Sequence, residues 1–402
     1  MIRVGITGVG VISAIGKTAP EFWDSVRQGQ SGIRPIRSAD CSSMRFRNGG
    51  EIPEYNPNEY FDERQVQFLD RFAQYAVIAA REAIKDSGVE LTPEVRAETA
   101  VITGACVGGQ SATEEGFYNL YKRGKSRVNP LTIPLTMANA GASHISMEFG
   151  LMGAGFTLST ACSSAAHAIG LAYWQVRSGG APLAVTGGSE APFTFGLLKA
   201  WEAMRVVSPT TCRPFCRDRD GMSLGEGAAM MVLEPLESAR ARGAKVYAEI
   251  VGFGMSSDAS HITHPSADGP AVSMQRALRD AGVRPEQVNY INAHGTATEV
   301  NDPMEARAIR QAIGPHTDRI AVSSTKSMHG HALGAAAAME SAATVMGMYH
   351  GMLPPTANFT ELDPACDLDV VANLARKAEA EYALSNSFAF GGLNATLAFR
   401  RV

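Results

Sequence analysis

Residues 153–168 read GAGFTLSTACSSAAHA and contain the change from strand to helix on which the interpretation of the whole chain depends. An apolar strand is predicted over Gly155–Leu158 and ends near Thr160. A helix rich in Ala and Ser is predicted over Ser163–Arg177. Cys162 therefore lies at a helix N-terminus, where unpaired N–H groups and the helix dipole lower the pKa of a thiol. We expect Cys162 to be a nucleophile, although a buried, inert cysteine would give the same pattern.

Strand-like and helical segments alternate along the rest of the chain. This alternation is typical of a layered α/β fold with buried sheets. The predicted strands are Val4–Thr7, Ala100–Thr103, Gly155–Leu158, Leu183–Thr186, Ala229–Leu233, Ala248–Gly252, Val288–Asn292, Ile320–Val322 and Ala395–Phe399. The predicted helices are Gln67–Asp86, Ser163–Arg177, Val272–Asp280, Pro303–Ile313 and Ala332–Met348. The second and the last of these helices lack a polar face, so we expect them to lie between sheets.

Two distant segments indicate an internal duplication. Met1–Gly10 (MIRVGITGVG) and Lys245–Gly254 (KVYAEIVGFG) both run from a basic residue or its neighbour through an apolar strand into Gly-x-Gly. The charged segment Glu234–Lys245 would join the two halves. We therefore predict an N-terminal half, residues 1–242, that carries the nucleophile, and a C-terminal half, residues 243–402.

Composition and charge exclude several classes of protein. With 45% apolar and 19% charged residues, the 402-residue chain can bury a large core and is not disordered. A net charge of −4 provides no overall basic field to attract nucleic acid or anionic lipid. The longest apolar run, Leu333–Met348, is interrupted by Glu340 and is shorter than the roughly 20 residues of a membrane span. Residues 1–16 make a poor secretory signal, so a cytoplasmic protein with reduced thiols is predicted.

Metal and nucleotide motifs are incomplete. The short-range pairs of potential metal ligands are His261-x-x-His264, His329-x-His331 and Cys212-x₃-Cys216. None is accompanied by a second pair at zinc-ligand spacing, so no metal site is predicted. The sequence Gly8-Val9-Gly10 lacks the third glycine of a dinucleotide-binding loop.

A second chemical motif occupies residues 292–302, NAHGTATEVND. A strand delivers His294 at its carboxyl end, where ligands usually bind in α/β sheets. Thr296 and Thr298 add hydroxyls in the loop that follows, and Asp302 is predicted to cap the next helix. The alternative for His294 is a hydrogen-bonded buried histidine without a chemical role.

A third motif occupies residues 322–340, VSSTKSMHGHALGAAAAME. Lys326 follows a strand and His331 opens an apolar helix. Glu340 lies nine residues further along that helix, where a charge is costly unless it is paired, and Lys326 is its predicted partner. A solvated lysine and a surface glutamate are the alternatives. Together the three motifs supply a thiolate and two imidazoles, which suits acyl transfer through a thioester.

The same motifs resemble those of a known family. Thr160–Ser164 (TACSS), Asn292–Thr296 (NAHGT), Lys326–His331 (KSMHGH) and Asn386–Gly392 (NSFAFGG) occur in this order along nearly the whole chain. They resemble the elongating β-ketoacyl-acyl-carrier-protein synthases, which have the thiolase fold. The resemblance implies two βαβαβαββ halves in a five-layered α/β/α/β/α sandwich, usually dimeric. The stretches TCRPF, KSMHGH and DPACDLDV resemble the nodulation protein E branch of the family, which makes unusual polyunsaturated acyl chains.

The resemblance also implies a reaction. Cys162 takes an acyl chain from an acyl carrier protein, and the backbone N–H groups of Cys162 and Phe390 form the oxyanion hole. His294 and His331 hold the malonyl thioester and stabilise the enolate left by decarboxylation. Attack on the acyl-enzyme then gives a 3-oxoacyl product two carbons longer.

Supporting residues follow from the same resemblance. Lys326 would pair with Glu340 and set the local field, and Thr296 and Thr298 would bind the phosphopantetheine arm of the carrier. Phe390 corresponds to a gating phenylalanine. No cofactor would be bound, because the substrates arrive on the carrier protein.

The sequence departs from the family pattern at two places, and these departures affect the partners that we expect. Leu393 stands where the family usually has Thr, and the surface is less basic than usual around residues 65–68. Arg64, Arg127 and Arg205 remain as a docking patch for a carrier protein. The second subunit of the dimer would be either an identical chain or a chain-length factor.

Two other functions remain as alternatives. A non-catalytic chain-length factor resembles the synthases but lacks the nucleophile, which Cys162 provides here. A degradative thiolase would need a second catalytic cysteine in a Cys-x-Gly context near the C-terminus, and Cys366 has no such setting. The length of the acyl chain and the choice between fatty acid and polyketide synthesis stay open.

Overall fold

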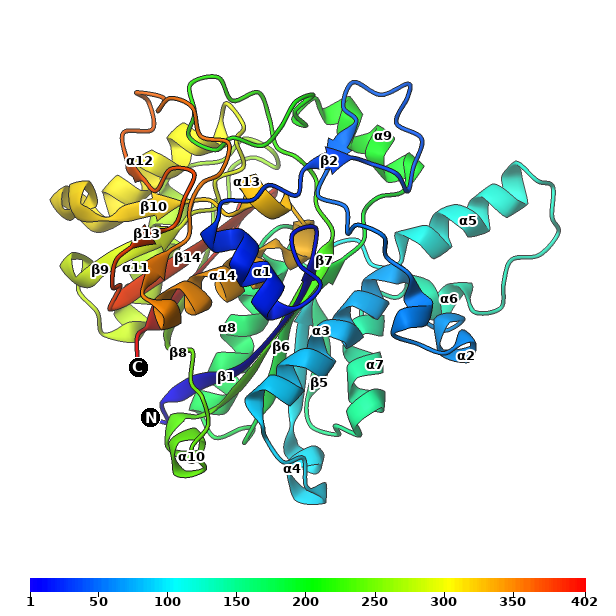
Figure 1. Ribbon diagram of the computed structural model, residues 1–402, viewed down its shortest axis with the longest axis horizontal. Coiled ribbons are helices and arrows are strands. Elements are labelled where there is room, and N and C mark those ends of the chain that lie inside the picture. Colours follow the sequence, from blue (N-terminus) through cyan, green and yellow to red (C-terminus); the bar gives the residue numbers. More distant parts are fainter.

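Strands from both halves of the chain form one mixed sheet in the computed structural model, which describes residues 1–402 (Figure 1). The sheet has 11 strands in the order β12-β10-β9-β14-β15-β8-β1-β7-β6-β4-β5. Their bounds are β1 (Val4–Ser13), β4 (Ala100–Gly104), β5 (Gly155–Leu158), β6 (Ala184–Glu190), β7 (Gly227–Pro235), β8 (Ala248–Ser257), β9 (Val288–Asn292), β10 (Ala321–Ser323), β12 (Asp369–Val370), β14 (Tyr382–Ala389) and β15 (Leu393–Arg400).

The predicted duplication is confirmed by the pairing of these strands. In the first half, β1 and β6 pair antiparallel with β7, and β4 pairs parallel with β6 and with β5. In the second half, β8 and β14 pair antiparallel with β15, and β9 pairs parallel with β14 and with β10. The halves join where Val4–Ile6 of β1 pairs with Ala248–Ile250 of β8. The first strands of the two repeats, β1 and β8, lie in the two segments whose similarity indicated the duplication.

Helices lie on both sides of each half-sheet and complete the layers. Helices α8 and α14 contact each other and strands of both halves, whereas α3 and α7 cover the first half and α11 and α12 the second. Burial between two half-sheets explains why α8 and α14 consist largely of small and apolar residues. The bounds are α3 (Arg71–Ser87), α7 (Ala140–Phe149), α8 (Ser164–Arg177), α11 (Asp268–Ala281), α12 (Asn301–Ile313) and α14 (Ala336–His350).

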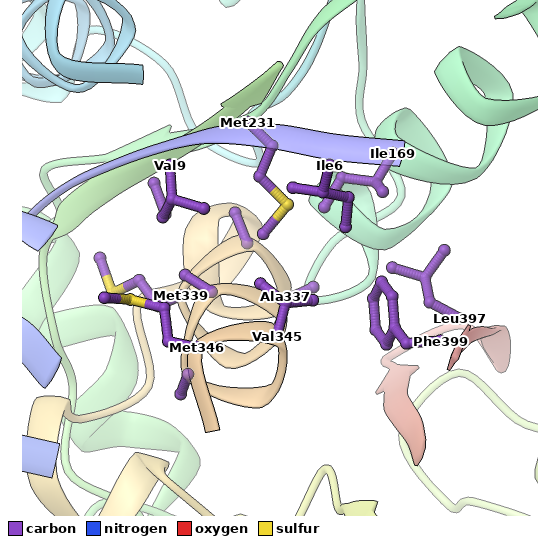
Figure 2. Packing of buried hydrophobic residues seen from close by; sticks show 14 of the residues in the cluster. Ile6, Val9, Ile169, Met231, Ala337, Met339, Val345, Met346, Leu397 and Phe399 are labelled. Carbon is purple, nitrogen blue, oxygen red and sulfur yellow. The ribbon is translucent and has the colours of Figure 1, made fainter. Parts of the chain in front are cut away.

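The largest apolar cluster surrounds α14 (Figure 2). Figure 2 shows Ile6 and Val9 of β1 and Met231 of β7 directed toward Met339 and other side chains of this helix. Phe399 of β15 closes the cluster from the second half-sheet. One continuous core therefore connects the two halves.

Smaller elements surround the layers. They are α1 (Ala19–Arg27), α2 (Glu63–Val66), α4 (Pro93–Glu98), α5 (Gln110–Tyr121), α6 (Thr132–Thr136), α9 (Phe195–Met204), α10 (Leu236–Ala241), α13 (Lys326–His329) and the two-stranded ribbons β2 (Arg34–Pro35) with β3 (Asn48–Gly49) and β11 (Met352–Leu353) with β13 (Arg376–Lys377). The proposed boundary at residue 242 falls between α10 and β8, and the division into two domains stays a prediction. None of the helices has both the length and the apolar character needed to cross a bilayer.

Two local expectations were wrong. The helix expected from Gln67 begins at Arg71, because the Asp70 carboxylate accepts the Phe72 N–H and caps it there. Asp302 does not cap α12, which begins one residue earlier. Its carboxylate instead accepts N–H groups from Phe215 (2.7 Å) and Ala297 (3.1 Å), so it joins two loops beside the sheet.

The close packing of α8 gives a test of the layered core. A Cβ added to Gly170 would overlap the ring of Phe253 in β8, so Gly170→Ala should lower the free energy of unfolding by about 1–3 kcal/mol. Gly116→Ala in α5 is the matched control. A Cβ there meets its nearest neighbour at 3.6 Å, an ordinary contact distance, and the substitution likewise replaces a glycine inside a helix. Urea unfolding of both variants measures the difference. Equal stability of the two variants would contradict the packing of α8 against β8.

Candidate active site

Most of the predicted site residues line a single cavity of about 370 Å³. Its wall is formed by residues from both halves of the chain, at the carboxyl ends of strands, as expected for an α/β sheet. The predicted residues that line it are Cys162, Arg205, His294, Thr296, Thr298, His331 and Phe390.

Cys162 lies in the turn between β5 and α8, where the chain bends sharply. Ala161 has a positive φ of 50°, and α8 begins two residues after the cysteine, at Ser164. The Ser163 hydroxyl donates to the Thr160 carbonyl (2.8 Å) and lies 2.9 Å from the Leu393 carbonyl, which it can also reach as a donor. The turn that carries the nucleophile is therefore fixed to the start of β15.

The pKa of the Cys162 thiol differs in direction from the expectation. Burial raises this pKa to about 11, although the charge of Lys326 and the backbone N–H groups of Cys162 and Phe390 act to lower it. The expectation of a lowered pKa was therefore wrong, because the sequence showed the helix end and not the depth of burial. The thiol is the resting form at neutral pH. The two backbone N–H groups that act to lower this pKa come one from each half of the chain.

His294 is held firmly at the end of β9. The carboxylate of Glu305 accepts the backbone N–H groups of His294 (2.8 Å) and Gly295 (2.7 Å). The Nδ1 atom of His294 lies 3.3 Å from the Nζ atom of Lys326. Because a lysine ammonium can only donate, Nδ1 is the acceptor and Nε2 carries the proton.

His331 has the same tautomer for a different reason. Its Nδ1 accepts the backbone N–H of Leu333 at 3.1 Å, which leaves the proton on Nε2. Its ring stands at 87° to that of His294, with centroids 5.5 Å apart. Burial, followed by the charge of Lys326, holds the pKa of both imidazoles well below the usual range. Both are therefore neutral N–H donors at physiological pH.

Lys326 and Glu340 form the predicted ion pair, deep in the protein. Their side chains are 0% and 1% exposed. The Nζ atom of Lys326 also donates to the His294 carbonyl at 2.6 Å. Burial raises the pKa of Glu340, and the charge of Lys326 acts against that shift.

The loop of Thr296 and Thr298 is held by a residue that the sequence did not single out. The two hydroxyls lie 2.9 Å apart at the wall of the cavity. Arg219 donates from Nε to the Thr298 carbonyl at 3.1 Å and forms an ion pair with Asp363. Its place in the charged stretch RDRDG gave no sign that its side chain is almost completely buried.

Phe390 stands at the wall of the cavity with 38% of its surface exposed. Gly391 and Gly392 follow it with φ of 84° and 69°, left-handed values that residues other than glycine rarely adopt.

The three arginines predicted to bind a carrier protein do not lie together. Arg205 lines the cavity, whereas Arg64 in α2 and Arg127 between α5 and α6 are exposed and do not line it.

The potential metal ligands do not assemble into a site. His261 and His264 both stand at the cavity wall, with ring centroids 4.7 Å apart. No group of three or more His, Cys, Asp or Glu side chains is arranged to hold a metal ion. All six cysteines are unpaired.

Comparison with known families agrees with this geometry. Residues 1–239 match the N-terminal domain of β-ketoacyl synthases, and residues 247–360 match the C-terminal domain. The chain belongs to the β-ketoacyl synthases. It is therefore a condensing enzyme, an acyltransferase, and the family resemblance of its motifs is confirmed.

Relatives align along the whole synthase. Nodulation protein E of Rhizobium sp. (strain N33) is 46% identical over 400 residues, which cover 100% of this chain and 99% of the relative. The 3-oxoacyl-[acyl-carrier-protein] synthase 2 of Vibrio cholerae is 42% identical over 410 residues, which cover 100% of this chain and 99% of the relative.

Solved structures confirm the thiolase-like fold of the synthase. The ishigamide ketosynthase/chain length factor superposes with a TM-score of 0.95 at 36% identity and covers 100% of this chain and 99% of its own. A β-ketoacyl synthase from Burkholderia phymatum gives 0.92 at 34% identity, with 100% of both chains covered.

The buried ion pair gives a prediction about stability. Lys326→Met leaves the Glu340 carboxyl buried without a partner and should lower the free energy of unfolding by about 3–5 kcal/mol. Lys326→Met combined with Glu340→Met removes both charges at similar volume and should recover most of that loss. Urea unfolding of the single and double variants is the measurement. A double variant no more stable than Lys326→Met would show that the unpaired Glu340 carboxyl is not the cause of the lost stability.

Proposed function

We propose that the synthase extends an acyl chain, bound to Cys162, by two carbons taken from a malonyl unit on an acyl carrier protein. The observation that carries this proposal is the meeting of a thiol, two neutral imidazoles and two backbone N–H donors in one cavity. The reaction is a decarboxylative Claisen condensation of the fatty-acid type, and its product is a 3-oxoacyl-carrier protein.

In the first half-reaction the sulfur of Cys162 attacks the thioester carbonyl of the incoming acyl chain. The bond to the phosphopantetheine sulfur breaks, and that sulfur leaves as a thiol with the proton that Cys162 gives up. The negative oxygen of the intermediate accepts the N–H groups of Cys162 and Phe390, the two groups that act to lower the pKa of the nucleophilic sulfur. A resting thiol is compatible with this step, because thioester exchange needs no net proton.

In the second half-reaction His294 and His331 donate from Nε2 to the carbonyl oxygen of the malonyl thioester. Loss of carbon dioxide leaves charge on this oxygen, and two preorganised donors stabilise the enolate. The enolate carbon attacks the acyl thioester, a carbon–carbon bond forms and the bond to the Cys162 sulfur breaks. The released thiolate then takes up a proton from solvent. Burial keeps both imidazoles unprotonated, and the charge of Lys326 acts in the same direction.

The substrate arm would enter past Thr296 and Thr298, whose paired hydroxyls suit the amides of phosphopantetheine. Arg205 stands at the same wall, with Arg64 and Arg127 elsewhere on the surface as further contacts for an acidic carrier. One similar structure is a type II PKS acyl-carrier protein in complex with its ketosynthase, at 30% identity and a TM-score of 0.90. No cofactor is required, and we place the reaction in the cytoplasm.

A second synthase-like subunit fits the free edge of the sheet. β5 is the outermost strand, and Met147, Met152 and Phe156 beside or within it are 67%, 72% and 41% exposed. An open strand edge flanked by large apolar side chains favours association. The partner is an identical chain or a chain-length factor. The presence of Cys162 argues against this chain being the non-catalytic member, and Cys366 does not line the cavity as a thiolase would require.

Replacing the nucleophile tests the proposal directly. Cys162→Ala should abolish formation of the 3-oxoacyl product and the acyl adduct, without loss of fold, because the other cysteines do not line the cavity. Cys41→Ala is the control, a buried cysteine outside the cavity. Product is measured with acyl and malonyl carrier proteins, and adducts by mass spectrometry. Condensation by Cys162→Ala near the wild-type rate would refute the proposal.

The two histidines should separate the half-reactions. His294→Ala and His331→Ala should each slow malonyl decarboxylation by roughly 10²–10³-fold while changing acyl loading of Cys162 much less. Because both pKa values lie well below the usual 6.5, the wild-type decarboxylation rate should not fall as the pH drops from about 8 to about 6. Loading and decarboxylation are followed separately. Equal losses in both half-reactions, or a fall in rate centred near pH 6.5, would contradict these roles.

A further inference from the structure

An aromatic side chain with no role in the proposed reaction packs against Phe390. Trp201 lies in α9, half-buried, and lines the cavity together with Phe390 and Cys162. The two rings stack with centroids 6.2 Å apart and an interplanar angle of 25°. The indole therefore provides a flat surface on which the phenyl ring rests beside the nucleophile.

The two partners of this stack differ in freedom. Helix α9 is anchored near its start, where the Glu114 carboxylate accepts the backbone N–H groups of Phe195 (3.0 Å) and Gly196 (2.5 Å). The residue after Trp201, Glu202, accepts the Arg45 backbone N–H at 2.6 Å. The indole is thus held in place through its own helix.

Phe390, in contrast, stands on the loop after β14, and no hydrogen bond restrains its ring. Gly391 and Gly392 follow it, and the loop is attached by backbone hydrogen bonds, from Gly391 to the Ile262 carbonyl (2.7 Å) and from Asp258 to the Gly392 carbonyl (2.9 Å). These bonds hold the loop and leave the phenyl ring itself free. Leu393, the next residue, has no hydroxyl that could add a side-chain hydrogen bond.

We propose that Trp201 determines which thioester loads Cys162, by holding the Phe390 ring in its resting position; this rests on the proposed condensing function. A thioester that reaches the sulfur must displace the ring and break the stack. An apolar acyl chain offsets that loss, because it buries its methylene groups between the indole and the displaced phenyl ring. A malonyl group does not, since it would place its carboxylate against the apolar ring. The stack thereby favours acyl over malonyl units at Cys162.

The first test is a competition for Cys162. Wild type, Trp201→Phe and Trp201→Ala are mixed with equal amounts of acyl and malonyl carrier proteins, and the adducts on Cys162 are weighed. The acyl-to-malonyl ratio should fall about two- to tenfold in Trp201→Ala, the range for loss of one aromatic pair, and less in Trp201→Phe. Trp174→Phe is the control, because Trp174 packs against Phe253 and does not line the cavity. An unchanged ratio in Trp201→Ala would overturn the proposal.

A double-variant cycle separates the stack from a general loosening of the cavity. If Trp201 acts through Phe390, Phe390→Ala should lower the ratio as Trp201→Ala does, and the double variant should lower it no further. Independent, additive effects would overturn the proposal. A fold check by unfolding accompanies each variant, and Trp201→Phe keeps an aromatic ring if Trp201→Ala proves unstable.

Fluorescence provides a readout that does not depend on turnover. In a variant with Trp23→Phe and Trp174→Phe, Trp201 is the one remaining tryptophan of the three. Acylation of Cys162 should change its emission, because Phe390 leaves the indole, and the change should vanish with Phe390→Ala. Emission that is unaltered by acylation would overturn the inference. Failure of wild type to load Cys162 at all would instead refute the proposed function, so the two failures are distinguishable.

Discussion

A single buried ammonium group, that of Lys326, sets the electrostatics of the whole site. Its Nζ atom contacts the Glu340 carboxylate, the His294 carbonyl and the Nδ1 atom of His294. Its charge lowers the pKa of His294, of His331 and of the Cys162 thiol. A buried ion pair of this kind contributes little net stability compared with apolar side chains of the same size. Its charge acts with burial to keep the two imidazoles neutral, whereas at Cys162 it opposes the larger effect of burial.

The duplicated fold explains how these groups come together. β5 and β10 occupy equivalent positions in the two half-sheets, as do β4 and β9. Cys162 follows β5, Lys326 follows the equivalent strand β10, and His294 follows β9. Because the half-sheets meet through β1 and β8 and through the contact of α8 with α14, the carboxyl ends of both repeats face one cavity. Neither half alone contains the nucleophile, the two imidazoles and both N–H donors.

The sequence predicted most of the architecture and most of the residues that line the cavity, because strand and helix periodicity and motif spacing are local properties. Burial is not local. The sequence therefore missed the direction in which the pKa of Cys162 is shifted, and it missed the role of Arg219 in holding the Thr298 loop. It also missed β14, whose Ser385, Asn386 and Ser387 are buried although polar residues in a strand usually mark its exposed face. Asp302 was assigned to its own helix for the same reason, since one of its hydrogen-bond partners, Phe215, lies in a loop distant in sequence.

The three reactive side chains of the resting site, Cys162, His294 and His331, carry no charge, and this bears on the proposed decarboxylation. Cys162 is a thiol, both imidazoles are neutral, and Lys326 is not part of the cavity wall. The ring centroid of Phe388 lies 6.0 Å from that of His294, so Phe388 adds an apolar surface beside the two imidazole donors. A malonyl carboxylate beside the Phe388 ring loses its water, whereas the thioester oxygen gains two N–H donors from the neutral imidazoles. The environment therefore opposes the negative charge at the carboxylate and favours it at the oxygen, which is the direction in which decarboxylation moves the electrons.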